Sequence, residues 1–293
     1  MSRSKKDDVF ESTADLSFLA STPIRLEKRL CKHVATARMS NKRKASELGG
    51  GDALVDEGLP SETISQIQLI MGFCRGTSGR EGLPLCFVHQ LYAVPRCNKT
   101  LIDTELKQMR EGKEIRLLHT PVGMAVAVAE DYARNLAAAG DANSEWTQTR
   151  RRFLSWLAER SHISASRVEL KAQPIRERFP LGALTDDDID ALLARGYLAP
   201  RRDLGIVDVF WLSHPDVNGI VCSVGNLRKQ ILQAIKRSHF KELGERELGK
   251  RKFEAQIFQR DFYYYDLLGV GDLVSVQTPR SRERIFRLAS DKK

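Results

Sequence analysis

One pattern occurs three times in this chain of 293 residues and limits what the chain can fold into. Residues 192–198 and 267–273 share the frame Leu-Leu-x-x-Gly-x-Leu, and residues 106–115 contain a looser copy with one extra residue after the glycine. Each copy predicts an amphipathic helix that ends at a glycine and leads directly into a β-strand. Any fold proposed for the chain must therefore contain this junction three times.

A pair of strands is predicted after each glycine. The first strands are expected at 115–118, 197–199 and 273–276, and the second strands at 124–128, 208–212 and 284–288. Helix, glycine, strand, turn and strand is the order found in the second half of a winged helix-turn-helix unit. The glycines Gly112, Gly196 and Gly271 are separated by 84 and 75 residues, which is the length of one small domain.

Further helices are expected before each glycine. Residues 62–74 place Ile64, Ile67, Ile70 and Met71 on one helical face, and residues 153–157 place Phe153, Trp156 and Leu157 at the same spacing. Thr185, followed by three aspartates, is typical of a helix N-cap with an acidic first turn. These patterns predict an α+β chain, mostly α-helical, with three tandem winged-helix domains at 59–140, 141–214 and 215–293.

Residues 1–58 differ in composition and predict a disordered basic tail. Between residues 25 and 44 there are eight basic residues and one acidic residue. The cluster of Lys42, Arg43 and Lys44 fits a nuclear-import signal or a nucleic-acid patch. The alternative is a solvated tail that only keeps the protein soluble.

The densest positive charge of the folded region lies between residues 222 and 252, which contain nine basic residues and three acidic residues. A helix is expected here with Leu227, Ile231 and Ile235 facing inward and with Lys229 and Lys236 facing outward. Basic side chains on such a helix can neutralise phosphates and release counterions. The candidate DNA contacts, including two in the predicted wing, are Arg228, Lys229, Lys236, Arg237, Lys241, Lys250, Arg251, Lys252, Arg280 and Arg282. The alternative is a solvated helix face in a protein-binding scaffold.

The sequence lacks the motifs of the common enzyme classes. It contains no G-x-G-x-x-G loop, no H-R-D-x-x-x-x-N and no D-F-G, so the machinery of a protein kinase is missing. It also contains no G-x-x-x-x-G-K-[ST], H-E-x-x-H or G-x-S-x-G. We expect no catalytic residues and no cofactor.

Neither a metal site nor a membrane span is expected. Cys86 and His89 have a ligand-like gap with Cys74 and Cys97 on either side, but buried structural cysteines explain the pattern equally well. The five cysteines are an odd number at irregular spacings, which favours reduced thiols in the cytosol or nucleus. No apolar run reaches the roughly 18 residues that a bilayer requires.

Several segments resemble the serine/threonine-protein kinase 19 family. The resemblance is carried by residues 230–243 (Gln-Ile-Leu-Gln-Ala-Ile-Lys-Arg-Ser-His-Phe-Lys-Glu-Leu), by 247–251 and 265–269, and by 106–116 and 130–132 in the first unit. It covers about residues 60–289. It implies three tandem winged helices in a nuclear, chromatin-associated protein that binds double-stranded DNA. The implied role is transcription-coupled nucleotide excision repair, in which the protein bridges stalled RNA polymerase II to a repair helicase complex.

By motif, the DNA-binding residues of that family fall on Lys236 and on Lys250 or Arg251, whereas Cys222 stands where a further family lysine is expected. The resemblance also leaves two other functions open, an atypical serine/threonine kinase and a winged-helix scaffold that binds only proteins. A monomer and a homodimer are both compatible with the sequence.

Overall fold

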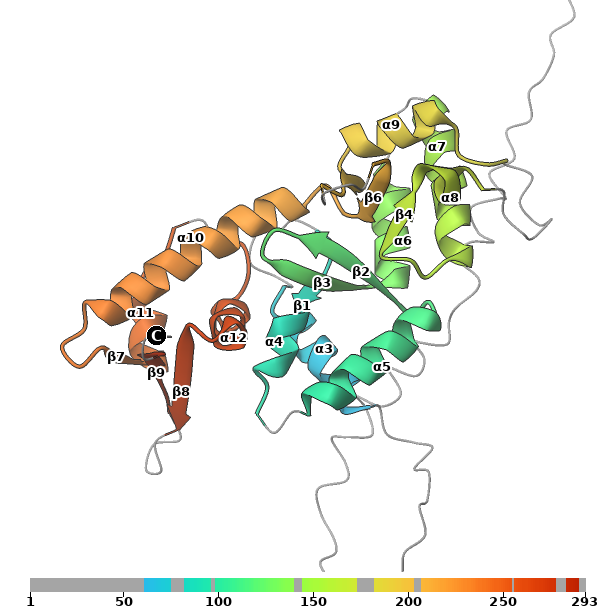
Figure 1. Ribbon diagram of the computed structural model, residues 1–293. Helices are drawn as coiled ribbons and strands as arrows, with labels where there is room; N and C mark the ends of the chain where they lie inside the picture. The colour runs from blue at the N-terminus through green and yellow to red at the C-terminus, as the bar shows by residue number, and fades with distance from the viewer. Residues whose placement is uncertain are drawn as a thin grey trace, which may run out of the picture. The chain divides into compact units, whose positions relative to one another are not determined.

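The structure is a computed structural model that describes residues 61–74, 82–95, 98–139, 144–172, 182–202, 207–254, 256–277 and 283–289 (Figure 1). The predicted basic tail, with Lys42, Arg43 and Lys44, lies outside these residues, and so do Cys97, Arg280 and Arg282. Within the described residues, one order of elements occurs three times: helix, short strand, two helices and two strands. We call each occurrence a repeat.

The first repeat begins at α3 and is followed by one additional helix, α6. Its elements are α3 (Glu62–Gly72), β1 (Leu85–Phe87), α4 (Val88–Tyr92), α5 (Lys99–Glu111), β2 (Ile115–Thr120), β3 (Gly123–Val128) and then α6 (Ala129–Ala138). The second repeat comprises α7 (Ser144–Glu159), β4 (Ser164–Ser166), α8 (Arg167–Lys171), α9 (Asp186–Ala194), β5 (Leu198–Pro200) and β6 (Val209–Leu212). The third comprises α10 (Val217–Lys236), β7 (Glu242–Gly244), α11 (Glu245–Lys250), α12 (Arg260–Val270), β8 (Leu273–Gln277) and β9 (Arg284–Leu288).

Each repeat has a three-stranded antiparallel sheet with the same strand order. The orders are β1-β3-β2, β4-β6-β5 and β7-β9-β8, so the last strand of each repeat is central. The hairpin pairs Ile115 with Val128 in the first repeat and Leu273 with Leu288 in the third. The six predicted hairpin strands are confirmed, and a short third strand, which the sequence did not reveal, joins each sheet.

The helix-to-strand junction depends on one left-handed residue. Gly196 and Gly271 have φ angles of +79° and +83°, a region that glycine enters without a steric penalty. In the looser copy, Gly112 has an ordinary φ of −70°, and the next residue, Lys113, is left-handed instead at +62°. The extra residue of this copy therefore moves the left-handed position off the glycine.

The acidic triplet begins a helix, as predicted. The Thr185 side chain accepts a hydrogen bond from the backbone N–H of Asp188, and the Asp188 carboxylate accepts one from the N–H of Thr185. This reciprocal capping box satisfies two N–H groups that the helix leaves unpaired. Asp188 also accepts hydrogen bonds from Thr149 and Arg152 of α7, which fixes α9 on the rest of the second repeat.

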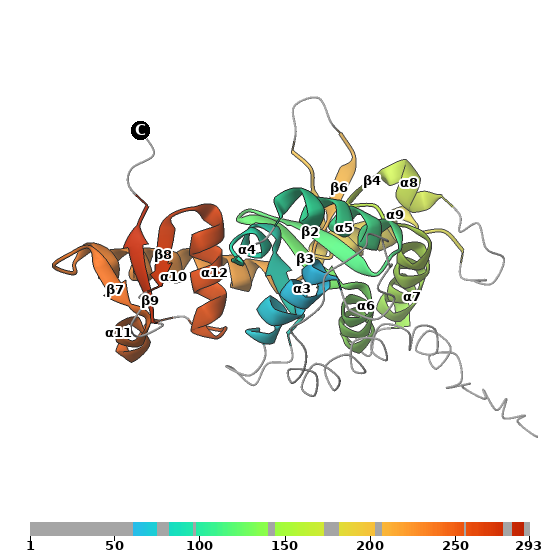
Figure 2. The ribbon, with the colours of Figure 1, turned by 90° about the horizontal axis from the view of Figure 1, so that it is seen from below.

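The first and third repeats are joined through α4 and α12, which lie side by side in both ribbon views (Figures 1 and 2). The Gln90 side chain donates a hydrogen bond of 2.8 Å to the carbonyl oxygen of Phe262. A Cβ atom at Gly269 would collide with the backbone carbonyl of His89, so glycine permits this close approach. The aromatic residues of α12 are part of the core, since Phe262, Tyr263 and Tyr264 are at most 2% exposed.

The first and second repeats are joined by buried polar contacts. Arg116 of β2 donates hydrogen bonds to the carbonyl oxygens of Leu157 and Arg160 at the end of α7. The Tyr132 hydroxyl donates one of 2.8 Å to the carbonyl oxygen of Ser213. One hydrophobic cluster runs through all three repeats, and residues 62–293 form a single compact unit. The repeats therefore pack on one another.

Candidate nucleic-acid interface

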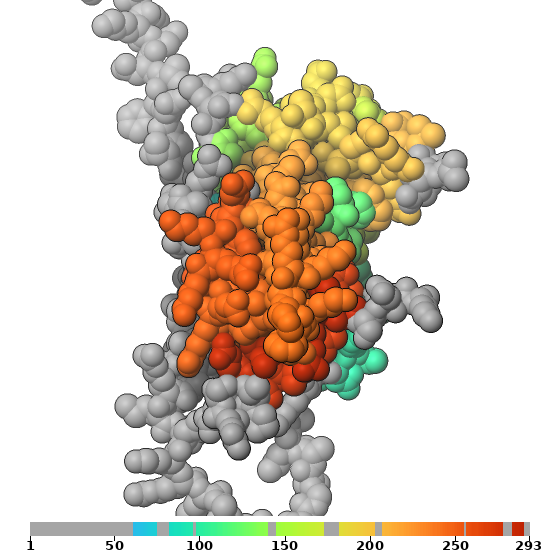
Figure 3. Space-filling model, turned by 90° about the vertical axis from the view of Figure 1, so that its left-hand side faces the viewer, coloured from blue at the N-terminus to red at the C-terminus, as the bar shows by residue number. Residues whose placement is uncertain are grey.

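Helix α10 presents an apolar face to the core and a polar face to solvent. Val224, Leu227, Ile231 and Ile235 are at most 1% exposed, which accounts for the inward stripe. The exposed positions recur at intervals of three and four residues, and they are Cys222, Asn226, Lys229, Gln233 and Lys236. Figure 3 looks onto the side of the molecule where α10 lies uncovered. The predicted outward direction of Lys229 and Lys236 is confirmed.

A second basic segment is held beside α10 by two hydrogen bonds. The Gln230 side chain accepts a bond of 3.0 Å from the N–H of Glu254 and donates one of 3.1 Å to the carbonyl oxygen of the same residue. Arg260, at the start of α12, donates hydrogen bonds to the carbonyl oxygens of Gly249 and Arg251. The run from Lys250 to Lys252 is thus tied to α10 on one side and to α12 on the other.

The acidic residues of this region are compensated by arginines. The ion pairs are Glu242 with Arg287 at 2.8 Å, Glu245 with Arg284 at 2.5 Å and Glu247 with Arg251 at 3.3 Å. The hydrogen bonds that Arg284 donates to Glu245 raise its pKa above the ordinary value, and so does the hydrogen bond to Asp261, although burial opposes this. Two of the three carboxylates are therefore neutralised by strand β9 rather than by the exposed lysines.

The remaining cations are free to meet an external anion. Within the described part of the chain, seven exposed basic side chains of this region make no ion pair: Lys229, Lys236, Arg237, Lys241, Arg246, Lys250 and Lys252. We call these seven residues the basic surface. Arg246 was not among the predicted contacts, and the structure adds it because α11 leaves its side chain exposed. A surface of this kind can neutralise several phosphates at once.

Arg228 differs from its predicted role. Its guanidinium forms two hydrogen bonds of 2.6 and 2.7 Å with the Asp266 carboxylate, which is fully buried in α12. His89 of the first repeat contacts the same carboxylate at 2.8 Å. Burial lowers the pKa of Arg228, but the hydrogen bonds to Asp266 outweigh it and the net shift is upward. The internal partner accounts for its charge, and we leave Arg228 out of the basic surface.

Helix α12 is not available to nucleic acid in the usual way. In a helix-turn-helix unit, the second helix of the turn enters the major groove, and α12 holds this position after α11 in the third repeat. Its aromatic residues are buried and it packs against α4. The corresponding helix of the second repeat, α9, carries no basic residue. Its exposed Asp186 and Asp190 pair with Arg167 and Lys171, and the exposed Asp187 repels phosphate. The positive surface therefore lies on α10 and α11.

The chain is similar to a winged helix repair factor. Winged helix repair factor 1 of Xenopus laevis is 27% identical over 199 residues, which cover 67% of this chain and 72% of the relative. No family model matches the chain. The name of this relative describes a repair factor and not a kinase.

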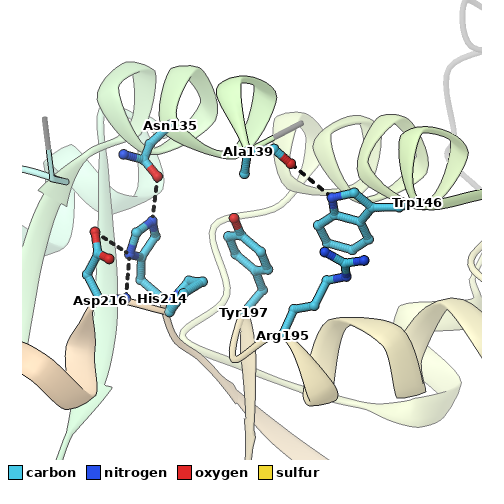
Figure 4. Close-up of a pocket in the computed structure, with 8 residues that line it drawn as sticks. Asn135, Ala139, Trp146, Arg195, Tyr197, His214 and Asp216 are labelled. Atoms are coloured by element: carbon cyan, nitrogen blue, oxygen red, sulfur yellow. Dashed lines mark hydrogen bonds and ion pairs between the residues drawn. The ribbon is translucent and has the colours of Figure 1, made fainter. Parts of the chain in front are cut away.

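A cavity of about 330 Å³ lies between the first and second repeats (Figure 4). In Figure 4, the Tyr197 hydroxyl points into it and the Arg195 guanidinium covers the ring of Trp146, at 4.3 Å from the ring centroid. His214 accepts a hydrogen bond at Nδ1 from the N–H of Asp216, so the ring proton lies on Nε2. The Nε2–H group donates a hydrogen bond of 2.8 Å to the side-chain oxygen of Asn135. This geometry fixes the tautomer of a buried histidine.

Of the residues considered for metal binding, the structure describes Cys74, Cys86 and His89, and these three do not form a metal site. Cys86 is fully buried, and burial, followed by the neighbouring Cys74, raises the pKa of its thiol well above the ordinary value. The His89 ring contacts Asp266 instead. Among the described residues, no three His, Cys, Asp or Glu side chains form a cluster suited to a metal ion, and no helix is long and apolar enough to cross a membrane.

Proposed function

We propose that this protein is a non-enzymatic, DNA-binding adaptor built from three winged helices, at 59–140, 141–214 and 215–293. The similarity to a protein named as a winged helix repair factor supports a role in DNA repair. The repeated sheet order supports the three-domain interpretation, since each repeat has the elements of one winged helix. We extend the proposal to the nucleus and to chromatin, where the duplex substrate is found.

The basic surface is the observation that carries the proposal. Its exposed lysines and arginines come from α10, from the turn after it, from α11 and from the segment that follows α11. The Gln230–Glu254 hydrogen bonds hold this last segment against α10. Contacts of this kind reach phosphates and not base edges, because α12, the helix of the third repeat that would enter the major groove, packs against α4. We therefore expect binding to double-stranded DNA that is sensitive to salt and insensitive to sequence.

The finer role follows from the family resemblance. We propose that the protein acts in transcription-coupled nucleotide excision repair and connects stalled RNA polymerase II with the repair helicase complex. The second repeat suits an adaptor, because α9 carries no basic residue for phosphate and can face a protein partner while the third repeat binds DNA.

A salt titration of duplex binding tests the DNA-binding proposal. The double variant Lys236→Glu with Lys250→Glu, which changes two members of the basic surface, should weaken binding to every duplex, whatever its sequence. The slope of log affinity against log salt should fall by about 2, since each phosphate contact contributes about 0.9. Fluorescence anisotropy with a labelled duplex at several salt concentrations measures both quantities.

A matched control separates the position of the charge from net charge. The variant Lys99→Glu with Lys107→Glu makes the same change in net charge on α5, where both side chains are exposed. It should bind duplex DNA like the wild type. Equal losses in the two double variants would contradict the assignment to the third repeat, and unchanged affinity in the first would leave the protein-only scaffold as the better function.

A further inference from the structure

Phe240 is an aromatic side chain that the fold leaves in solvent. Its side chain is 77% exposed. Among the large hydrophobic residues that are exposed in the described part of the chain, Phe240 is the aromatic one. By contrast, Phe258, Phe262 and Phe286 of the same repeat are at most 8% exposed. An exposed phenylalanine ring adds little to the stability of the fold, because its apolar surface remains in contact with water.

The backbone holds Phe240 at the tip of a tight turn between α10 and β7. The N–H of Lys241 donates a hydrogen bond of 3.1 Å to the carbonyl oxygen of Ser238, so His239 and Phe240 are the two central residues of a β-turn. The Ser238 hydroxyl donates one of 2.7 Å to the carbonyl oxygen of Ile235 and ties the turn to the helix end. The turn therefore presents Phe240 on a short, hydrogen-bonded loop and not on a long flexible one.

The turn also adopts a conformation that side chains disfavour. Lys241 has a φ angle of +55°, which is in the left-handed region and uncommon for a residue with a Cβ atom. The His239 ring packs edge to face against Phe240, with ring centroids 4.5 Å apart. A strained turn that keeps an apolar ring in water is more readily explained by a ligand for that ring than by packing.

The charge around Phe240 indicates what the ligand is. Lys236, Arg237 and Lys241 lie within four residues of it, all are exposed, and none has an ion-pair partner among the described residues. An aromatic ring beside several cations matches a nucleobase and its flanking phosphates, because the ring stacks on the base while the cations pair with the backbone. In a continuous duplex both faces of every internal base are covered, whereas an unpaired base has a free face.

We propose that Phe240 stacks on an unpaired base and gives the third repeat a preference for DNA that is opened or distorted over continuous duplex. The proposal rests on the proposed DNA-binding function and adds its substrate class. The basic surface supplies the affinity for duplex DNA of any kind, and Phe240 adds stacking that is available only where base pairing is broken.

Binding to two DNA probes tests the proposal. The probes are a fluorescein-labelled duplex and the same duplex with a central mismatched bubble, compared at one salt concentration by anisotropy. The wild type should bind the bubble about tenfold more tightly, as stacking on one base allows. Phe240→Ala should lose this preference and keep the affinity for continuous duplex and the salt slope, since no charge is removed. Circular dichroism and thermal unfolding should match the wild type because the side chain is exposed.

Two further variants decide whether stacking is the cause. Phe240→Tyr should keep the preference for the bubble, and Phe240→Leu should lose it although it remains apolar. A preference retained in Phe240→Leu or in Phe240→Ala would overturn the proposal, as would equal losses on both probes.

The wild type gives two further outcomes. Equal binding to duplex and bubble would also overturn the stacking proposal and leave the proposed function intact. Binding to neither probe at low salt would refute the proposed function itself. Binding of the full chain to anionic vesicles that Phe240→Ala abolishes, with no preference for the bubble, would assign the ring to a membrane.

Discussion

At the scale of single residues, two neighbours on α10 show how the fold decides which charges are available. Arg228 and Lys229 are adjacent basic residues, yet Arg228 is bound to Asp266 and Lys229 is exposed. Helical periodicity predicted Lys229 correctly, because its direction depends only on its own helix. It could not reveal the partner of Arg228, which lies 38 residues away on α12.

His214 provides a prediction about pH. Burial lowers its pKa below the ordinary value, and the Asp216 carboxylate at 3.6 Å opposes this only in part. The folded protein therefore resists protonation at a pH where the unfolded chain, with a pKa of about 6.5, binds a proton. The stability that His214 contributes is present above this pH and is lost as the pH falls below it, with a slope of at most about 1.4 kcal/mol per pH unit.

Urea unfolding at pH 7.5, 6.5 and 5.5 checks this prediction. The free energy of unfolding of the wild type should fall across the series by more than that of His214→Asn, which carries no titratable group. We expect the variant to be less stable at pH 7.5, because the hydrogen bonds to Asn135 and to the N–H of Asp216 are weakened. Parallel losses in the two proteins would refute the prediction.

At the scale of elements, the sequence predicted the helices and strands whose signal lies in a short run of neighbouring residues. The six hairpin strands follow a glycine or a turn and were found, as was the Thr185 cap. The short strands β1, β4 and β7 have three residues each, too few for an alternating pattern. Ser164–Ser166 becomes a strand only because β6 pairs with it, and that partner begins more than forty residues later in the chain.

The sequence does not show whether an aromatic residue in a turn is exposed, because that also depends on the surrounding structure. The basic residues around Phe240 were recognised as candidate contacts from charge alone, but a phenylalanine next to Lys241 is equally compatible with a core position. The structure distinguishes the two because the β-turn from Ser238 points the ring outward.

The junction glycine supports a prediction at this scale. Gly196 follows α9 with a φ angle of +79°, and a Cβ atom there would meet nothing closer than 3.5 Å. The cost of Gly196→Ala is therefore conformational and should be about 1 to 2 kcal/mol of unfolding free energy. Gly72→Ala is the control, because Gly72 is not in the left-handed region and has open space around it. Chemical denaturation of the two variants compares them directly, and equal effects would contradict the role assigned to the left-handed residue.

At the scale of the whole molecule, the net charge of +9 conceals an uneven distribution. Within the described part of the chain, seven exposed basic side chains without an ion pair gather on the third repeat, whereas α9 of the second carries no basic residue and exposes Asp187. Such a separation allows one chain to bind a polyanion at one end and a protein at the other. Sequence counts located the basic stretch, but only the ion pairs of β9 show which of its charges remain uncompensated.

The packing of the three repeats was not predictable from the repeated pattern, which describes each repeat by itself. The contacts between the first and third repeats join residues about 175 positions apart, such as His89 with Asp266 and Gln90 with Phe262. Because α12 is used for this contact, the third repeat binds DNA, in our proposal, through α10 and α11. The same packing makes the repeats dependent on one another.

Gly269 is the position at which this dependence can be measured. Gly269→Ala would drive a methyl group into the backbone of His89 and Gln90, so α4 and α12 would have to separate. We expect a loss of about 3 kcal/mol, the upper range for overpacking, since a backbone cannot move aside as a flexible side chain can. Gly225→Ala is the matched control on α10, where open space surrounds the glycine and alanine should stabilise the helix by up to about 1 kcal/mol. Thermal unfolding should show one transition for the wild type and for Gly225→Ala, and a lower or divided transition for Gly269→Ala. A Gly269→Ala protein that unfolds like the wild type would mean that the first and third repeats do not pack through α4 and α12 in solution.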